Sequence, residues 1–267
     1  MAQALHPGLM RLPPRPPPDI PAGWVTGPPD FVGVGTQRSG TTWWWSVIGS
    51  HPAIACPGGG DGAANGLYQA KEYHFFGHYD GVRDIDPGLY SRYFPRPPGK
   101  LAGEWTPRYM HDLWTPPMLA QVAPRAKLLV LLRDPVARFL SGLAHWTSWG
   151  LPAEPLFADQ FSRGLYWHQL QVLLSYFPRD QVLVLQYERC KADPAGQAER
   201  TLGFLGCDLG QWQPPGQLSQ PVGVVHKSKP QLSAASLDAL RRAYQPEISR
   251  LAADFPEIDL ARWPTAR

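Results

Sequence analysis

The run AKLLVLL, residues 126–132, restricts most strongly what this chain can fold into. It is apolar at every position except Lys127, whereas a strand with one face in water alternates apolar and polar side chains. A nearly continuous apolar strand is typical of a parallel sheet that is covered on both faces. Parallel neighbours need long crossover connections, which are usually helices. The run therefore predicts an α/β protein.

The rest of the chain supplies the other elements that such a fold needs. Short apolar runs predict further strands at residues 31–34, 100–107 and 181–186. Apolar spacing and helix-end residues predict helices at residues 41–48, 135–146, 165–177, 194–205 and 233–253. Strands that alternate with helices indicate a three-layer α/β fold with a mostly parallel central sheet flanked by helices. The sequence has no internal repeat, so we expect a single domain over residues 30–267.

The segment Phe31–Trp45, FVGVGTQRSGTTWWW, predicts a strand, a glycine-rich loop and the start of a helix. Gly33 and Gly35 are expected to let the backbone turn tightly and approach a ligand closely. Unpaired N–H groups and the helix dipole then favour an anion. The GxxxxG spacing imitates a nucleotide-binding P-loop, but Thr41 stands in place of the lysine, and Arg38 is the basic residue of the loop. A purely structural turn remains an open alternative.

A second cationic position follows the apolar run. Arg133, Asp134 and Pro135 come at the carboxyl end of that strand, and Ser141 lies about two turns into the helix that follows. Ligands of open α/β sheets bind outside the carboxyl ends of the strands. We therefore expect Arg133 and the glycine-rich loop to meet at the same edge of the sheet.

Glu72 and His74 lie two positions apart within an aromatic segment. In an extended backbone their side chains share one face. Aromatic surroundings disfavour a charged carboxylate, so we expect a raised pKa for Glu72, which suits proton abstraction. A solvated glutamate beside a core histidine is the alternative that the sequence leaves open.

Composition excludes several classes of function. A hydrophobic content of 43%, a charged content of 18% and a net charge of +3 indicate a globular protein with a weak overall field, so nucleic acid is not expected as a partner. No apolar stretch is long enough to span a membrane, and no signal peptide is found. Cys56, Cys190 and Cys207 suggest neither a disulfide framework nor a zinc site, and no metal-ligand cluster is found. We expect a reducing, cytoplasmic location.

Two segments have compositions typical of irregular structure. Residues 1–29 are rich in proline and are expected to form an extended or disordered leader. Residues 57–66, PGGGDGAANG, are expected to form a flexible loop, either a plain surface connection or a flap over a site.

Taken together, these segments resemble the sulfotransferases that use 3′-phosphoadenosine 5′-phosphosulfate (PAPS), most closely the branch that acts on heparan sulfate and related glycans. The resemblance covers roughly residues 31–255. It implies the P-loop-like sulfotransferase fold, PAPS as the donor, 3′-phosphoadenosine 5′-phosphate (PAP) as the product nucleotide, and no metal.

The resemblance assigns cofactor-binding residues by position. The glycine-rich loop is similar to the family's 5′-phosphosulfate loop, which here comprises Thr36, Gln37, Arg38, Ser39, Gly40, Thr41 and Thr42. Residues 131–135 with Ser141 resemble the family's 3′-phosphate element, and Tyr187 matches a tyrosine that contacts adenine. Lys227 and Lys229 lie in a segment similar to a late cofactor-binding loop.

The resemblance also implies the chemistry of transfer. Glu72 is similar to the general base of the glycan branch, with His74 orienting or assisting it. Arg133 and Ser141 hold the 3′-phosphate, which distinguishes this donor from ATP. Arg38 stabilises charge on the bridging oxygen by electrostatics and hydrogen bonding, since arginine does not release its proton.

The acceptor site is assigned in the same way. Glu104 and Trp105 belong to a segment that resembles a second site segment of the family, but the glycan enzymes have a lysine where this chain has Trp105. An aromatic pocket is expected instead, lined by Trp43, Trp44, Trp105, Trp146 and Trp149. The expected acceptor is a hydroxyl on a small, glycosylated or lipid-linked metabolite or on a glycan.

Two other functions stay open. A P-loop kinase would use Asp134 as a magnesium ligand, although the missing lysine after Gly40 argues against it. A non-catalytic homologue that binds carbohydrate would keep the fold, although the presence of Glu72, Arg38 and Arg133 argues against that.

Overall fold

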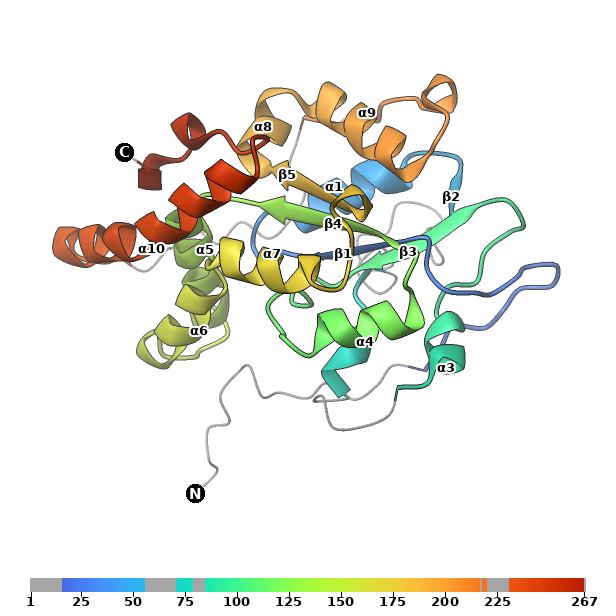
Figure 1. Ribbon diagram of the computed structural model, residues 1–267, viewed down its shortest axis with the longest axis horizontal. Coiled ribbons are helices and arrows are strands. Elements are labelled where there is room, and N and C mark those ends of the chain that lie inside the picture. The colour runs from blue at the N-terminus through green and yellow to red at the C-terminus, as the bar shows by residue number, and fades with distance from the viewer. Residues whose placement is uncertain (1–15, 56–70, 79–84, 217, 220–230, 267) are drawn as a thin grey trace.

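The central sheet consists of five parallel strands in the order β2-β3-β1-β4-β5 (Figure 1). This architecture comes from a computed structural model that describes residues 16–55, 71–78, 85–216, 218–219 and 231–266. The strands are β1 (Phe31–Gly35), β2 (Ile54–Ala55), β3 (Leu101–Trp105), β4 (Lys127–Leu132) and β5 (Val182–Gln186). The α/β fold with a parallel central sheet is therefore confirmed.

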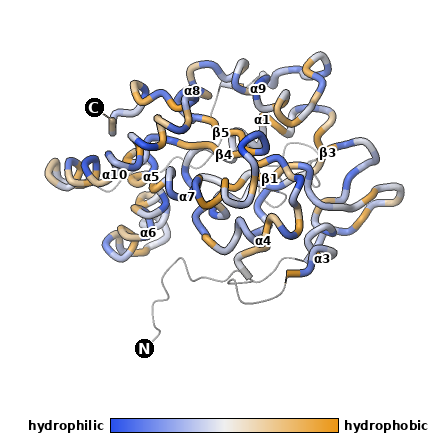
Figure 2. The backbone as a smooth tube through the Cα atoms, in the orientation of Figure 1, coloured by the Kyte–Doolittle hydropathy of each residue, from blue (hydrophilic) through white to orange (hydrophobic). Residues whose placement is uncertain are grey.

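Residues of the strands alternate between two hydrophobic cores, one on each face of the sheet. In β4, Leu128 and Val130 belong to one core, whereas Leu129 and Leu131 belong to the other. Figure 2 shows the strands as largely hydrophobic segments at the centre of the molecule. The continuous apolar run in the sequence arises because both faces of the strand need apolar side chains.

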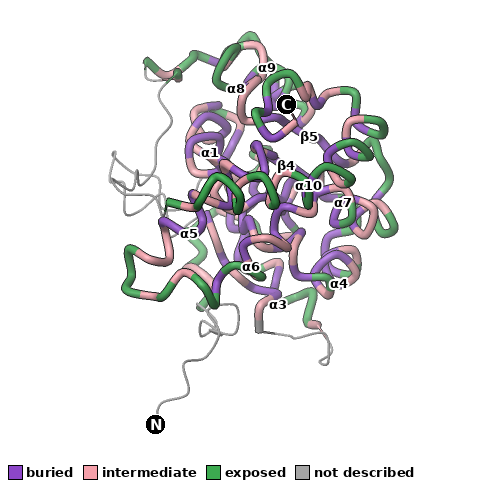
Figure 3. Tube along the Cα trace, turned by 90° about the vertical axis from the view of Figure 1, so that its left-hand side faces the viewer, coloured by how far each residue is buried: buried purple, intermediate pink, exposed green. Residues whose placement is uncertain are grey.

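Helices cover both faces of the sheet. α1 (Thr41–Gly49), α8 (Tyr187–Ala192) and α9 (Pro194–Leu205) pack on one face. α4 (Thr115–Val122), α7 (Tyr166–Leu174) and α10 (Ala234–Asp254) pack on the other. α3 (Pro87–Ser91), α5 (Pro135–Thr147) and α6 (Phe157–Ser162) complete the domain. The exposed outer sides of the helices surround a buried centre in Figure 3.

The predicted elements agree closely with the observed ones. The apolar spacing in the last helix is confirmed, because Tyr244, Ile248 and Leu251 of α10 are buried. The prediction missed β2, α3, α4, α6 and α8. β2 has 2 residues and α8 has 6, which are too few to show a hydrophobic period.

The two ends of the described chain differ in their attachment to the domain. Residues 16–29 form one isolated bridge, between Val25 and Arg96, and no helix or strand. Residues 1–15 of the predicted leader lie outside the described residues. The C-terminal segment is anchored instead, because Trp263 is buried and its Nε1 donates to Glu188 Oε2 at 2.8 Å.

Candidate active site

The glycine-rich loop leaves β1 and enters α1 through two left-handed residues. Arg38 has φ 68° and Gly40 has φ 90°. The loop is held from within, because the hydroxyl groups of Thr36 and Ser39 lie 2.5 Å apart and Thr36 Oγ1 donates to Leu131 O at 3.0 Å. Since Thr36 and Ser39 are buried, their hydroxyl groups shape the loop from inside. The anion-binding capacity of the loop then lies in its backbone N–H groups and in the N-terminus of α1.

Two glycines in this region allow close approach, but to protein rather than to a ligand. A Cβ atom at Gly40 would lie 2.8 Å from the ring of Tyr187. A Cβ atom at Gly33 would overlap the indole ring of Trp105, which covers β1 at this point. The expectation that Gly33 serves ligand approach is therefore wrong, because this glycine makes room for a core tryptophan.

The predicted donor-site residues meet beside the loop. Arg38 Nε donates to Ser141 Oγ at 3.2 Å, and an Arg133 Nη atom donates to the backbone oxygen of Arg38 at 3.2 Å. The Arg133 guanidinium lies 5.1 Å from the ring centroid of Tyr187. Two guanidinium groups, a hydroxyl and an aromatic ring thus converge at the carboxyl edge of β1 and β4. Such a set can hold a phosphorylated nucleotide.

Asp134 has a structural role next to this site. Its Oδ1 caps α5 by accepting from Ala137 N at 2.9 Å and also accepts from Thr265 Oγ1 at 2.6 Å. Its Oδ2 accepts from Thr265 N at 2.8 Å. The carboxylate is thus engaged on both oxygens, which does not fit the magnesium ligand of a kinase. Among the described residues, no group of three or more His, Cys, Asp or Glu is arranged to hold a metal ion.

Glu72 and His74 lie together, with Lys71 beside them. His74 Nε2 is 3.3 Å from Glu72 Oε2, and Lys71 Nζ is 2.8 Å from Glu72 Oε1. Burial raises the pKa of the Glu72 carboxyl, but Lys71 and His74 outweigh this effect and lower that pKa to about 2. The expectation of a raised pKa is therefore wrong, because the adjacent lysine and the histidine outweigh the effect of burial.

Glu104 supports the segment that carries Glu72. It is fully buried, and its Oε2 accepts from Tyr73 N at 3.2 Å and from Thr106 Oγ1 at 2.6 Å. Its Oε1 accepts from the hydroxyl groups of Tyr90 and Tyr109 at 2.8 and 3.1 Å. The substrate-binding role predicted for Glu104 is corrected accordingly, because four protein donors surround its carboxylate.

The predicted tryptophan lining is also corrected. Trp43, Trp44 and Trp105 are at most 1% exposed, and Trp105 Nε1 donates to Gly35 O at 3.1 Å. These rings fill the core and have no surface to offer an acceptor. Trp146 is partly buried and Trp149 is 74% exposed, so only these two can line an acceptor site.

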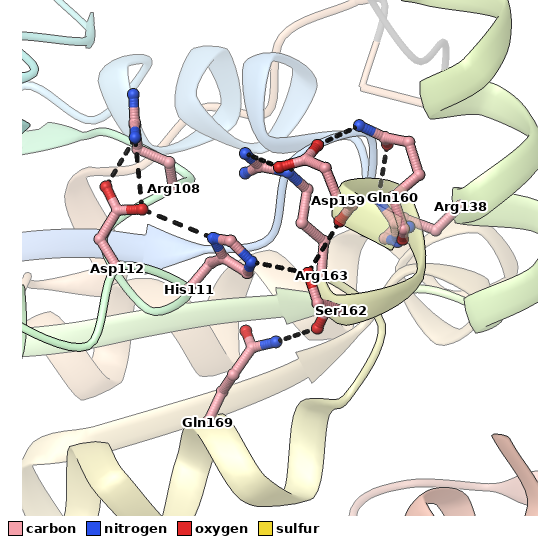
Figure 4. Close-up of polar contacts among 9 residues, drawn as sticks. All are labelled: Arg108, His111, Asp112, Arg138, Asp159, Gln160, Ser162, Arg163 and Gln169. Atoms are coloured by element: carbon pink, nitrogen blue, oxygen red, sulfur yellow. Dashed lines mark hydrogen bonds and ion pairs between the residues drawn. The ribbon is translucent and has the colours of Figure 1, made fainter. Parts of the chain in front are cut away.

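A polar network fixes the loop after β3 to α5 and α6 (Figure 4). His111 Nε2 lies 3.0 Å from Ser162 Oγ, and Arg138 Nη1 donates to Gln160 Oε1 at 3.3 Å. Through α6, the network thus connects the loop that begins at Thr106 with α5, which carries Ser141.

Some predicted residues lie outside the described part of the chain. These are Lys227, Lys229, Cys56 and the 57–66 loop. Lys71, in contrast, was not predicted as part of the site. Its position next to Glu72, in a chain with Thr41 and not lysine directly after Gly40, was the signal in the sequence.

A family model described as the sulfotransferase domain matches residues 28–237. The chain belongs to the sulfotransferase family. It is 30% identical over 193 residues to heparan sulfate glucosamine 3-O-sulfotransferase 6 of Mus musculus, covering 67% of this chain and 52% of that protein. It is 33% identical over 127 residues to the membrane-associated sulfotransferase kil1 of Dictyostelium discoideum, covering 45% of this chain and 24% of that protein. The chain spans about half the length of the heparan sulfate 3-O-sulfotransferases it matches.

Solved sulfotransferase structures share the fold. The sulfotransferase from Alicyclobacillus acidocaldarius superposes with a TM-score of 0.60 at 22% identity, covering 88% of this chain and 98% of that one. The sulfotransferase domain of the Synechococcus PCC 7002 olefin synthase gives a TM-score of 0.53 at 17% identity, covering 91% and 98%. None of the helices in the described part of this sulfotransferase is long and apolar enough to cross a membrane.

Proposed function

We propose that this sulfotransferase transfers the sulfuryl group of PAPS to a hydroxyl group, with Glu72 as the general base. The acceptor oxygen attacks sulfur in line with the bridging oxygen, and a new O–S bond forms. The hydroxyl proton passes to Glu72. The bond from sulfur to the bridging oxygen breaks, and its electron pair stays on the 5′-phosphate of PAP. Positioning and charge stabilisation supply most of the catalysis in such a displacement.

The convergence of Arg38, Arg133, Ser141 and Tyr187 is the observation that carries the proposal. Arg133 directly follows β4 and Ser141 lies in α5, so they approach the loop from a separate segment and suit a second phosphate on the same nucleotide. Arg38 lies in the loop itself and suits the bridging oxygen. The ring of Tyr187, next to Gly40, suits adenine. Lys227 and Lys229 remain predicted donor contacts.

The base must be ionised before it can accept a proton. With a pKa of about 2, Glu72 is a carboxylate throughout the neutral range. Such a low pKa makes it a weak base in isolation. Its advantage is position, because Lys71 links it to Thr41 and Thr42 at the N-terminus of α1, where the loop would present the sulfuryl group. The acceptor hydroxyl also becomes more acidic as the O–S bond forms.

The class of acceptor is inferred from the names of the relatives and not from side chains of this chain. Three of the five predicted tryptophans are buried in the core, so only Trp146 and Trp149 of that set can form an apolar surface for the acceptor. We propose a sugar-bearing acceptor, either a glycan or a glycosylated metabolite, because relatives at about 30% identity are named as glucosamine sulfotransferases. A cytoplasmic location remains a prediction.

The test uses sulfur-labelled PAPS with heparan-type oligosaccharides, an alkyl glucoside and a simple phenol as acceptors. We expect metal-independent transfer to at least one sugar hydroxyl. Glu72→Gln should lower the rate by about a hundredfold or more, the range for loss of a general base. Glu154→Gln, which alters an exposed glutamate, is the matched control and should leave the rate unchanged. Transfer by Glu72→Gln at the wild-type rate would contradict the assignment of the base.

A further inference from the structure

Lys71 is a buried cation that contacts both the proposed base, Glu72, and the start of α1. Its side chain is 1% exposed. Its Nζ donates to Glu72 Oε1 at 2.8 Å, to Thr41 Oγ1 at 3.0 Å and to Thr42 Oγ1 at 3.2 Å. A buried ammonium is costly unless it is paired and hydrogen-bonded. Its partners here are the carboxylate assigned as the base and two residues of the donor loop.

The position of Lys71 is informative because the glycine-rich loop has no lysine of its own. A P-loop carries its lysine directly after the second glycine, where this chain has Thr41. The ammonium of Lys71 reaches the hydroxyl group of that threonine from a separate segment. A cation at a helix N-terminus is repelled by the helix dipole, so this position is unfavourable unless an anion compensates. Glu72 is the compensating anion in the free protein.

We propose that Lys71 is a positioning residue, whose ammonium group ties the Glu72 carboxylate to the hydroxyl groups of Thr41 and Thr42 in the first turn of α1. This inference rests on the proposed function, since it takes Glu72 as the base. Because Thr41 and Thr42 belong to the loop that receives the donor, Lys71 fixes the distance between the base and the donor. A base held at this distance is ready for an acceptor hydroxyl without a rearrangement of its own.

The charges around Glu72 support this role. Among the described residues, the charged or titratable groups that act on its carboxyl are Lys71 and His74 of its own segment. α1 contributes the hydroxyl groups of Thr41 and Thr42 through Lys71, and Glu104 of β3 lies behind, on the backbone of Tyr73. Burial by itself raises the pKa of the Glu72 carboxyl. If Lys71 is removed, His74 is the remaining group of these two that lowers the pKa of Glu72 against the effect of burial.

The direct test measures the titration of Glu72 and needs no acceptor. Glutamate carboxyl carbons are labelled with carbon-13, and the Glu72 signal is identified by its loss in Glu72→Gln. In the wild-type protein we expect this signal to stay that of a carboxylate below pH 4. In Lys71→Met and in Lys71→Gln we expect a midpoint above the ordinary 4.5. The second variant keeps a hydrogen-bonding group and serves if the first does not fold.

The control and the kinetic measurement separate positioning from general damage. Lys127→Met removes a half-buried lysine at the opposite end of β4 and should leave the Glu72 titration unchanged. In the labelled-PAPS assay, Lys71→Met should lower kcat at least tenfold and move the acid limb of the pH profile to higher pH. The affinity for PAP, measured by calorimetry, should fall by a smaller factor than kcat, because the base acts on the acceptor hydroxyl and not on the product nucleotide.

The outcomes distinguish this inference from the proposed function. If Glu72→Gln is inactive while Glu72 titrates in Lys71→Met as in the wild type, the proposed function stands and the role of Lys71 is wrong. If Glu72→Gln transfers sulfate at the wild-type rate, the base is misassigned, and the role of Lys71 in positioning it is overturned with it, whatever the titration shows.

Discussion

Individual residues in this protein show how strongly a neighbour can reverse a prediction from residue type. A glutamate among aromatic rings was expected to have a raised pKa, yet Lys71 and His74 lower the pKa of Glu72 to about 2. Trp105 was expected at the acceptor, yet it is fully buried over Gly33. The convergence of Arg38, Arg133 and Ser141 was predictable, because both segments follow the carboxyl ends of parallel strands. Burial and pairing were not, because they depend on contacts between distant segments.

The lowered pKa of Glu72 predicts a pH-dependent contribution to stability. A carboxyl group with a pKa lower in the folded than in the unfolded state stabilises the fold above its unfolded value and loses that contribution as pH falls. For Glu72 the window runs from 4.5 down to about 2. A difference of roughly 2.5 in pKa corresponds to about 3 kcal/mol at neutral pH.

Urea unfolding of Glu72→Gln and of the wild type at pH 7 and pH 3.5 measures this contribution. At pH 7 the wild type should be more stable than Glu72→Gln. The difference between their free energies of unfolding should be smaller at pH 3.5. Glu154→Gln should differ from the wild type by no more than about 0.5 kcal/mol at both pH values, as is usual for an exposed position. A difference between the wild type and Glu72→Gln that is larger at pH 3.5 than at pH 7 would contradict the pairing of Glu72 with Lys71.

Among the elements, those with a long or continuous pattern were predicted and the short ones were not. β4 was predicted from an apolar run, and α10, which has 21 residues, from the helical spacing of its apolar residues. β2 pairs with β3, which the local sequence does not encode. The glycine-rich loop was recognised from its spacing, but its internal support by Thr36 and Ser39 required the structure.

The pairing of β1 with β3 makes a prediction about Gly33. In Gly33→Ala the new methyl group would overlap the ring of Trp105, so we expect a loss of about 1–3 kcal/mol or more in the free energy of unfolding. Gly203→Ala is the matched control, because Gly203 lies in α9 with nothing within 4 Å of an added Cβ atom. It should stabilise the protein by about 0.5–1 kcal/mol. Equal stability of Gly33→Ala and the wild type would contradict the packing described here.

Across the molecule as a whole, the C-terminal segment packs next to the predicted donor site. Thr265 binds Asp134, Asp134 N donates to Glu188 Oε1 at 3.1 Å, and Trp263 donates to the other oxygen of Glu188. Burial raises the pKa of the Glu188 carboxyl. This network connects the chain end to the starts of α5 and α8, next to Arg133 and Tyr187. The sequence did not predict this link, because it joins residues more than 130 positions apart.

The anchored C-terminus predicts unequal effects of two tryptophan substitutions. Trp263→Ala removes a fully buried ring and should cost about 3–5 kcal/mol in the free energy of unfolding. Trp149→Ala removes a ring that is 74% exposed and should change it by no more than about 0.5 kcal/mol. Chemical unfolding of both variants measures the difference, and similar values for the two would show that the C-terminal segment does not pack as described.

We propose above all that the site binds the nucleotide of PAPS. Calorimetric titration with PAP, beside ATP with magnesium, tests it most directly. We predict metal-independent binding of PAP that is tighter than binding of ATP. Arg133→Ala should weaken it by about tenfold to a hundredfold, the range for a lost hydrogen bond to a charged group. Arg125→Ala, an exposed arginine before β4, should leave it unchanged. Tighter binding of ATP with magnesium, or PAP affinity that survives the loss of Arg133, would contradict the account.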